Sequence, residues 1–198
     1  TTTSTPMGAN ASNASEGWQM PEYPGGCEAG QYWQPCETIV AAGCVNCPAK
    51  SWSLPGRNGS AACKCLAGYT GPDGGPGQRC PMGTYKSEVG SAACTACSAG
   101  ATSDEGSEAI EACRCLAGRI GPNGGPCLAC PAATYKGSEG SEECTACFEH
   151  SETLPGSTAL SDCKCSRGYY HNGTRNECIR CPSNMASALG SVTISACL

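Results

Sequence analysis

The number and spacing of its cysteines constrain this chain more than any other feature of its sequence. The chain has 198 residues, of which 20 are cysteine. Two cysteine patterns recur at a step of 50 residues: Cys-x-x-Cys begins at Cys44, Cys94 and Cys144, and Cys-x-Cys begins at Cys63, Cys113 and Cys163. A fixed period of this length is typical of tandem modules, each of which is one small structural unit.

The other apolar residues are too few to build a large hydrophobic core. Ile, Leu, Val and Phe together number 18, whereas Gly numbers 27 and Pro 14. No window shows a sustained helical period, and Gly or Pro interrupts every apolar run. We therefore predict small disulfide-rich all-β modules in tandem, which form an elongated rod with little helix.

Cysteines at these spacings could also bind zinc, and the two interpretations imply different compartments. The chain has only two histidines and an even number of cysteines, which favours disulfides. It also carries four N-glycosylation sequons, at Asn10, Asn13, Asn58 and Asn172. These features predict a secreted, extracellular or cell-surface glycoprotein without a bound metal or cofactor.

The repeat divides the chain into five segments. The motif Cys-Pro-x-x-Thr-Tyr-Lys begins at Cys80 and again at Cys130. A Gly-Pro-Asp/Asn-Gly-Gly turn follows each of the first two Cys-x-Cys pairs. The expected segments are a Thr/Ser-rich extended arm (1–26), three cysteine-rich repeats (27–79, 80–129 and 130–180) and a partial repeat (181–198).

These motifs resemble the ephrin-receptor-like cysteine-rich repeat, which has a layout similar to EGF-like and tumour necrosis factor receptor modules. The pattern consists of Cys-Pro-x-Gly-Thr-Tyr, then Gly-Ser-x-x-Cys-x-x-Cys, then Cys-x-Cys-x-x-Gly-Tyr-x-Gly-Pro-Asp-Gly-Gly. It covers residues 27–198 and is similar to extracellular repeat arrays of algae and protists. The resemblance implies a disulfide-bonded extracellular module, but such modules occur in receptors, adhesins and matrix proteins alike.

Two disulfide schemes are open. A sequential scheme pairs neighbouring cysteines of each unit, whereas an EGF-like scheme pairs first with third and second with fourth. If Cys181 and Cys197 occupy the first and second positions of a partial unit, only the sequential scheme lets them pair, unless the chain is cut from a longer array. The sequential scheme predicts Cys27–Cys44, Cys47–Cys63, Cys80–Cys94, Cys97–Cys113, Cys115–Cys127, Cys130–Cys144, Cys147–Cys163, Cys165–Cys178 and Cys181–Cys197.

The first repeat departs from this pattern. Gly77 stands where Cys127 stands one repeat later, and an additional cysteine, Cys36, appears instead. Cys36 and Cys65 are the two cysteines without a partner in this scheme, so we expect them to form a disulfide with each other, either within one chain or between neighbouring copies.

Charge and motif patterns argue against several functions. The net charge of −5 and the lack of a basic cluster exclude nucleic-acid binding, and no apolar stretch is long enough to span a membrane. Cys-x-x-Cys here lacks the βαβ context of a thioredoxin site. His150 and His171 are expected to be solvated loop residues without a nearby nucleophile.

The acidic residues do not indicate a catalytic or metal-binding site either. The pairs Asp104–Glu105 and Glu142–Glu143 are expected to be ordinary surface charges, since adjacent residues do not hold the spacing of a catalytic acid and base. Calcium is the more reasonable metal, but no calcium-binding motif includes the candidate oxygen ligands, which are Asp73, Asn123, Glu16, Glu22 and Glu28.

The large aromatic residues are concentrated near the start of the chain. All three tryptophans and two of the seven tyrosines fall within the first 52 residues: Trp18, Tyr23, Tyr32, Trp33 and Trp52. They form either the small core of the first repeat or a contact surface, and these alternatives are compatible.

We therefore expect a non-enzymatic structural subunit of an extracellular filament, appendage or surface coat. The arm and first repeat of one copy would contact the partial last repeat of the next, giving a head-to-tail homo-polymer. The alternative is the ligand-binding or adhesive ectodomain of a cell-surface receptor.

Overall fold

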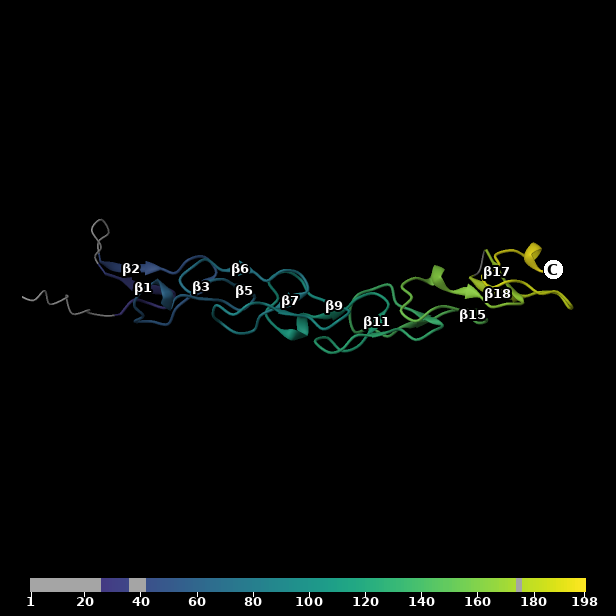
Figure 1. Cartoon of the computed structure of the whole chain (residues 1–198), viewed down its shortest axis with the longest axis horizontal. Helices are drawn as coiled ribbons and strands as arrows, with labels where there is room; N and C mark the ends of the chain where they lie inside the picture. Colours follow the sequence, from purple (N-terminus) through teal and green to yellow (C-terminus); the bar gives the residue numbers. More distant parts are fainter. Residues whose placement is uncertain (1–25, 36–41, 174–175) are drawn as a thin grey trace, which may run out of the picture.

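The computed structural model of the chain describes residues 26–35, 42–173 and 176–198. These residues form a narrow rod in which the elements follow one another along the long axis in sequence order (Figure 1). The described chain therefore starts at one end of the rod and finishes at the other. The predicted elongated array of small modules is confirmed.

Short strands and turns make up each module, because Gly and Pro interrupt the chain every few residues. The described residues contain no α-helix, only four three-residue 3₁₀ turns, η1 Ser60–Ala62, η2 Ile110–Ala112, η3 Leu160–Asp162 and η4 Ile194–Ala196. The strands are β1 Gln31–Gln34, β2 Gly43–Asn46, β3 Ser51–Trp52, β4 Lys64–Cys65, β5 Tyr69–Thr70, β6 Gln78–Arg79, β7 Thr84–Tyr85, β8 Thr95–Ala96, β9 Ala101–Thr102, β10 Arg114–Cys115, β11 Arg119–Ile120, β12 Leu128–Ala129, β13 Thr134–Tyr135, β14 Thr145–Ala146, β15 Ser151–Glu152, β16 Lys164–Cys165, β17 Tyr169–Asn172 and β18 Glu177–Arg180.

The strands pair into nine separate two-stranded antiparallel sheets. Each repeat contributes three of them. We call these the first hairpin (β1–β2, β7–β8, β13–β14), the middle loop (β3–β4, β9–β10, β15–β16) and the last hairpin (β5–β6, β11–β12, β17–β18). The register repeats as well: Tyr85 pairs with Thr95 in the second repeat, and Tyr135 pairs with Thr145 in the third.

Cysteine forms the apolar core of the rod. Among the described residues, every buried apolar side chain belongs to a cysteine, and several of these side chains, such as Cys63 and Cys80, are fully buried. Leu54, Leu66 and Leu128, by contrast, remain exposed. The modules are therefore stabilised mainly by cross-links, each of which closes a short loop and contributes about 3 kcal/mol in the chain-entropy model.

The described residues form nine disulfides, and all nine have the sequential pairing. They are Cys27–Cys44, Cys47–Cys63, Cys80–Cys94, Cys97–Cys113, Cys115–Cys127, Cys130–Cys144, Cys147–Cys163, Cys165–Cys178 and Cys181–Cys197. One bridge closes each hairpin or middle loop, except for the last hairpin of the first repeat.

The expected bridge between Cys36 and Cys65 is not present. Cys65 is a free, buried thiol, 3.7 Å from the carbonyl oxygen of Gly71, and Cys36 lies outside the described residues. The partner position in the last hairpin is Gly77, where a β-carbon would lie 2.7 Å from the carbonyl oxygen of Lys50. Close backbone contact has thus replaced the third bridge of this repeat.

The partial repeat is built like a middle loop, and its expected assignment to the first and second cysteine positions is wrong. Its bridge, Cys181–Cys197, spans 16 residues, as do the three middle-loop bridges, whereas the first-hairpin bridges Cys80–Cys94 and Cys130–Cys144 span 14. A 3₁₀ turn, η4, precedes Cys197, as η1 precedes Cys63. Leu198 exchanges two backbone hydrogen bonds with Ala186, both of 2.9 Å.

Candidate functional site

The joint between successive repeats is the most regular polar feature of the rod. At the first joint, Gly68 N–H donates to the Lys86 carbonyl, Cys80 N–H donates to the Gly68 carbonyl, and Gly90 N–H donates to the Cys65 carbonyl, each at 2.8 Å. The second joint has the same three bonds 50 residues later, between Gly118, Lys136, Cys130, Gly140 and Cys115. The same three backbone hydrogen bonds therefore join the first repeat to the second and the second repeat to the third.

The joint requires glycine at its centre. Gly68 has φ of +74° and Gly118 has φ of +73°, a region that favours glycine. A β-carbon at either position would lie 2.3 Å from the carbonyl oxygen of Gly106 or Gly156 respectively. No side chain fits at this contact, and the two backbones pack directly on each other.

A buried lysine lies at each of these two joints, and at the second joint its ammonium bonds to both repeats, whereas the Lys86 ammonium donates to the Glu88 carbonyl in its own repeat. Lys86 and Lys136 are both only 3% exposed. The Lys136 ammonium donates to the carbonyl oxygens of Gly140 at 2.6 Å and of Arg119 at 3.1 Å, so it links two repeats. A buried ammonium without such acceptors would cost several kcal/mol. Neither lysine is among the site residues predicted from the sequence, although their repetition after 50 residues is a signal for them.

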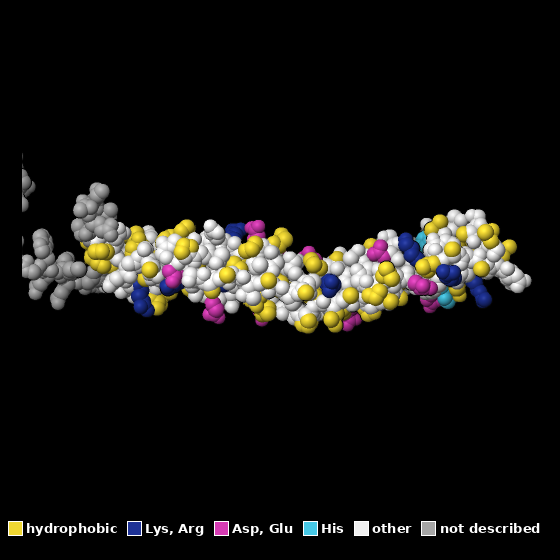
Figure 2. Space-filling model, in the orientation of Figure 1, with side chains coloured by type: hydrophobic (Ala, Val, Ile, Leu, Met, Phe, Trp, Pro, Cys, Tyr) yellow, Lys and Arg dark blue, Asp and Glu magenta, His cyan; other side chains and the backbone are white. Residues whose placement is uncertain are grey.

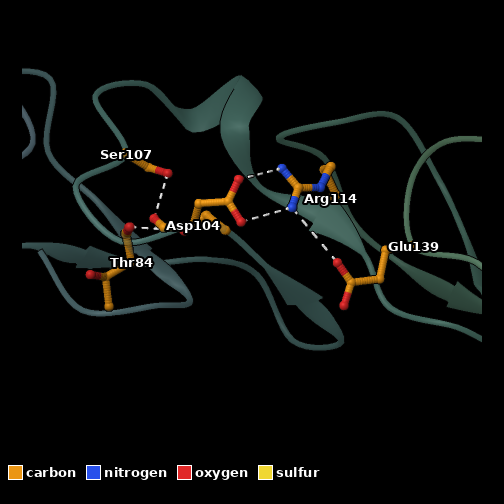
Figure 3. A network of polar contacts seen from close by, with 6 residues as sticks. Thr84, Asp104, Ser107, Arg114 and Glu139 are labelled. Atoms are coloured by element: carbon orange, nitrogen blue, oxygen red, sulfur yellow. Dashed lines mark hydrogen bonds and ion pairs between the residues drawn. The ribbon is translucent and has the colours of Figure 1, made fainter.

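A second polar connection, in the central repeat, joins the middle loop to the first hairpin of the next repeat (Figure 3). Arg114 donates from Nη1 to Asp104 Oδ2 at 3.2 Å and from Nη2 to Asp104 Oδ1 at 3.1 Å. Its Nη2 also lies 3.7 Å from Glu139 Oε2, across the joint. The hydrogen bonds and the charge of Arg114 lower the pKa of Asp104, and Asp104 in turn raises the pKa of Arg114.

The network adds one detail to the expectation for the acidic pairs. Asp104 is a surface charge, and it forms a bidentate ion pair with Arg114. Glu142 accepts a hydrogen bond of 2.6 Å from Ser138 within its own hairpin.

One of the two histidines differs from the expected solvated loop residue, whereas His150 is exposed in a turn as expected. His171 lies in β17 and is partly buried, with its ring centroid 5.7 Å from that of Phe148. His150 stacks on Tyr169 at 4.3 Å between centroids. Both rings therefore pack at the end of the third repeat.

The Cys-x-x-Cys cysteines are all structural. Within each motif the two cysteines bond to different partners: Cys94 bonds to Cys80, whereas Cys97 bonds to Cys113. The motifs consequently join one hairpin to the next loop and hold no free dithiol.

The calcium candidates are not brought together. Asp73 forms an ion pair with Lys64, so its charge is already compensated, and Glu28 and Asn123 are exposed in other parts of the rod. Glu16 and Glu22 lie outside the described residues. In the part of the chain that the structure describes, no group of three or more His, Cys, Asp and Glu side chains could hold a metal ion.

Two of the four sequon asparagines lie among the described residues. Asn58 is exposed, next to the middle loop of the first repeat. Asn172 is partly exposed at the end of β17, and its Nδ2 donates to Glu177 Oε1 at 3.1 Å. Asn10 and Asn13 lie outside the described residues.

The described aromatic residues of the first repeat do not form a buried core. Tyr32 and Trp33 are partly buried in β1, and Trp52 in β3 is exposed. Trp18 and Tyr23 lie outside the described residues. The exposed indole of Trp52 is available for contact, and its surroundings are described below.

Apolar side chains are spread along the surface of the rod in small groups (Figure 2). In the partial repeat, Leu189, Val192 and Ile194 are at least half exposed, and Leu198 is almost fully exposed. No helix among the described residues is long and apolar enough to cross a membrane.

The comparison with known families agrees with these repeats. Residues 68–113 and 118–163 match the family described as tyrosine-protein kinase ephrin type A/B receptor-like. Each match begins at the joint glycine, Gly68 or Gly118, and finishes at the cysteine that closes the next middle loop, Cys113 or Cys163. The resemblance to ephrin-receptor-like repeats is therefore confirmed for two tandem copies. A search of curated proteins found no match to the chain.

Proposed function

We propose that this chain, with its two tandem ephrin-receptor-like repeats, is a non-enzymatic structural subunit of an extracellular filament, appendage or surface coat. The observation that carries the proposal is the repeated joint at Gly68 and Gly118, through which one unit follows the next by a single type of head-to-tail contact. Such a heterologous contact does not close on itself, and it makes a rod when it is repeated. Nine disulfides and the family match favour an extracellular setting.

The self-assembly contact is proposed to join the two ends of neighbouring copies. The partial repeat exposes Leu189, Val192 and Ile194. In the middle loop of the third repeat, 34 residues earlier, the equivalent residues are Pro155, Thr158 and Leu160. Val192 of the partial repeat thus stands where the middle loop has the polar Thr158. This apolar surface suits the aromatic arm and first repeat of a second copy, in which all the tryptophans lie.

Deletion of the arm tests this contact. A chain without residues 1–20 should keep its nine disulfides and yet form no polymer, as judged by sedimentation and negative-stain microscopy of concentrated protein. The double variant Val192→Ser with Ile194→Ser should give the same result from the other end. If both proteins still form filaments of normal length, the ends are not the joint.

N-glycans are proposed at the sequons. Asn58 is exposed and offers its side chain to solvent. Peptide mapping of secreted protein before and after glycosidase treatment should show a mass loss on the peptides that contain Asn58 and Asn172. Unchanged masses for both peptides would contradict glycosylation.

A second candidate function is a ligand-binding or adhesive ectodomain of a cell-surface receptor. The exposed Trp52 favours it, because exposed tryptophan is typical of binding hot spots. This function predicts a protein that stays monomeric at high concentration and binds to a cell surface, whereas a filament subunit should polymerise without any partner.

A further inference from the structure

A groove on the first repeat is lined by apolar side chains, which we call its floor, and by basic side chains, which we call its rim. Its volume is about 550 Å³, and its floor is lined by Trp52, Leu54 and Val89, which are 39%, 49% and 57% exposed. Arg57 and Lys64 line the same groove. The groove lies between the middle loop of the first repeat and the first hairpin of the second.

The third repeat has the equivalent groove 100 residues later. Its volume is about 660 Å³, and its lining includes Glu152, Leu154, Asp162, Lys164 and Leu189. Leu54 corresponds to Leu154 and Lys64 to Lys164. Leu189 of the partial repeat lines this groove, as Val89 of the second repeat lines the first groove. The acidic Glu152 and Asp162 replace Trp52 and Ala62, so this groove lacks the basic character of the first.

The central repeat shows what these positions do when they are polar. Asp104 and Glu139 stand where Leu54 and Val89 stand, and Arg114 stands where Lys64 stands. Both carboxylates lie close to Arg114 (Figure 3), at the sequence positions that line the groove in the first repeat. In the first repeat, leucine and valine replace the two acids and expose apolar surface beside Arg57 and Lys64.

The rim of the first groove has unbalanced positive charge. Lys64 forms an ion pair with Asp73, whereas Arg57 forms no ion pair with any residue that the structure describes. An occupant that suits this groove combines large apolar side chains with carboxylates.

One segment of the chain has this chemistry. Residues 16–23 read Glu-Gly-Trp-Gln-Met-Pro-Glu-Tyr, with three large apolar side chains and two carboxylates. This segment also connects to the rod beside the groove. A β-carbon on Gly26 would lie 2.7 Å from Gly56 Cα, and Gly56 lies between the groove residues Leu54 and Arg57 in the sequence. Trp18 is eight residues from Gly26, a reach of at most about 28 Å.

We propose that residues 16–23 of the arm dock in the groove of their own first repeat, formed by Trp52, Leu54, Arg57, Lys64 and Val89. Trp18 and Met20 contact the apolar floor, and Glu16 or Glu22 pairs with Arg57. This contact lies within one chain and does not require polymerisation. The docking and the proposed filament can therefore each be disproved without disproving the other. It makes the arm and first repeat a single composite surface.

Photo-crosslinking of the full chain tests the docking. Trp18 is replaced by p-benzoylphenylalanine in secreted protein at a concentration where it is monomeric, and the linked peptides are identified by mass spectrometry. An equal mixture of ¹⁴N and ¹⁵N protein distinguishes links within a chain from links between chains. The docked arm should give links within one chain, to the peptides that carry Leu54 or Val89, and high salt should lower their yield.

Two matched double variants separate docking from folding. Leu54→Asp with Val89→Glu gives the first groove the acids of the central repeat, and these repel Glu16 and Glu22. The yield of the link should fall about tenfold, with the nine disulfides unchanged. Leu154→Asp with Leu189→Glu makes the same change in the third repeat and should leave the yield unaltered.

Three results would overturn the docking. These are no link to the first groove, links only between chains or to the third groove, and an equal loss of yield in both double variants. Links between chains alone would show that a second copy, and not the same chain, provides the arm.

Discussion

Gly118 and Gly156 pack backbone against backbone, so that a β-carbon on Gly118 would lie only 2.3 Å from the Gly156 carbonyl oxygen. The contact joins the last hairpin of one repeat to the middle loop of the next. Gly68 and Gly106 have the same contact 50 residues earlier. The regular stacking of the rod thus depends on positions where no side chain fits.

Gly118→Ala should loosen the second joint. The substitution creates this clash and places alanine at φ of +73°, which together should cost at least about 1 kcal/mol. Hydrogen exchange of the Gly118 and Cys130 amides, which donate across the joint, should become about fivefold faster or more. Gly43→Ala is the control, because no atom of the described residues lies within 4 Å of a β-carbon there. Unchanged exchange in Gly118→Ala would show that the joint tolerates a side chain.

Lys136→Met should destabilise the same joint by another route. The substitution leaves the carbonyl oxygens of Arg119 and Gly140 without the buried ammonium that binds them, which should cost about 1–3 kcal/mol. Calorimetry should show a thermal transition at least about 2 °C lower. Lys164→Met replaces an exposed lysine whose ammonium donates to the Ser161 carbonyl. This control substitution should lower the transition temperature by less. An equal or higher transition temperature in Lys136→Met would show that packing of the methionine stabilises the joint as much as the hydrogen bonds of the lysine do.

The cysteine spacing was sufficient to predict the tandem disulfide-bonded modules, because the sequence displays the period of the cysteines directly. The spacing left two disulfide schemes open, and the sequential scheme was favoured only through the position assigned to Cys181 and Cys197. The last bridge was assigned to the wrong position because Cys181 follows a last hairpin, where a first hairpin usually begins. The 3₁₀ turn before Cys197 was the overlooked signal. The exposure of Trp52 and the contact of Arg114 with Glu139 depend on which loops meet across a joint, and single-sequence spacing does not display these contacts.

Cys65 should behave as a protected free thiol. Gly77 occupies the partner position, and the Cys65 side chain is fully buried. An alkylating reagent should therefore leave Cys65 unmodified in the native protein and modify it in guanidinium chloride without any reductant. Cys115, the equivalent residue in the second repeat, should react only after reduction, because it is bonded to Cys127. Protection of Cys65 in denaturant without reductant would show that it is bridged after all.

The carboxyl group of Asp104 should titrate below its ordinary pKa. Hydrogen bonds and charge from Arg114 favour the ionised carboxylate, and they outweigh the opposing effect of burial. Because the folded pKa is the lower one, the ion pair stabilises the fold at pH values above the ordinary aspartate pKa. This contribution is lost as the pH falls through the folded pKa.

Carboxyl NMR across an acid titration measures this shift directly. Arg114→Gln should move the pKa of Asp104 upward, toward its ordinary value, and added salt should move it in the same direction in the unmodified protein, since both groups are accessible to solvent. Lys164→Gln, the equivalent change in the third repeat, should leave the pKa of Asp104 as it is. If Asp104 titrates at the same pH with and without Arg114, then the pair does not persist in solution. The central repeat would in that case expose an unpaired carboxylate at Asp104, where the other two repeats expose leucine.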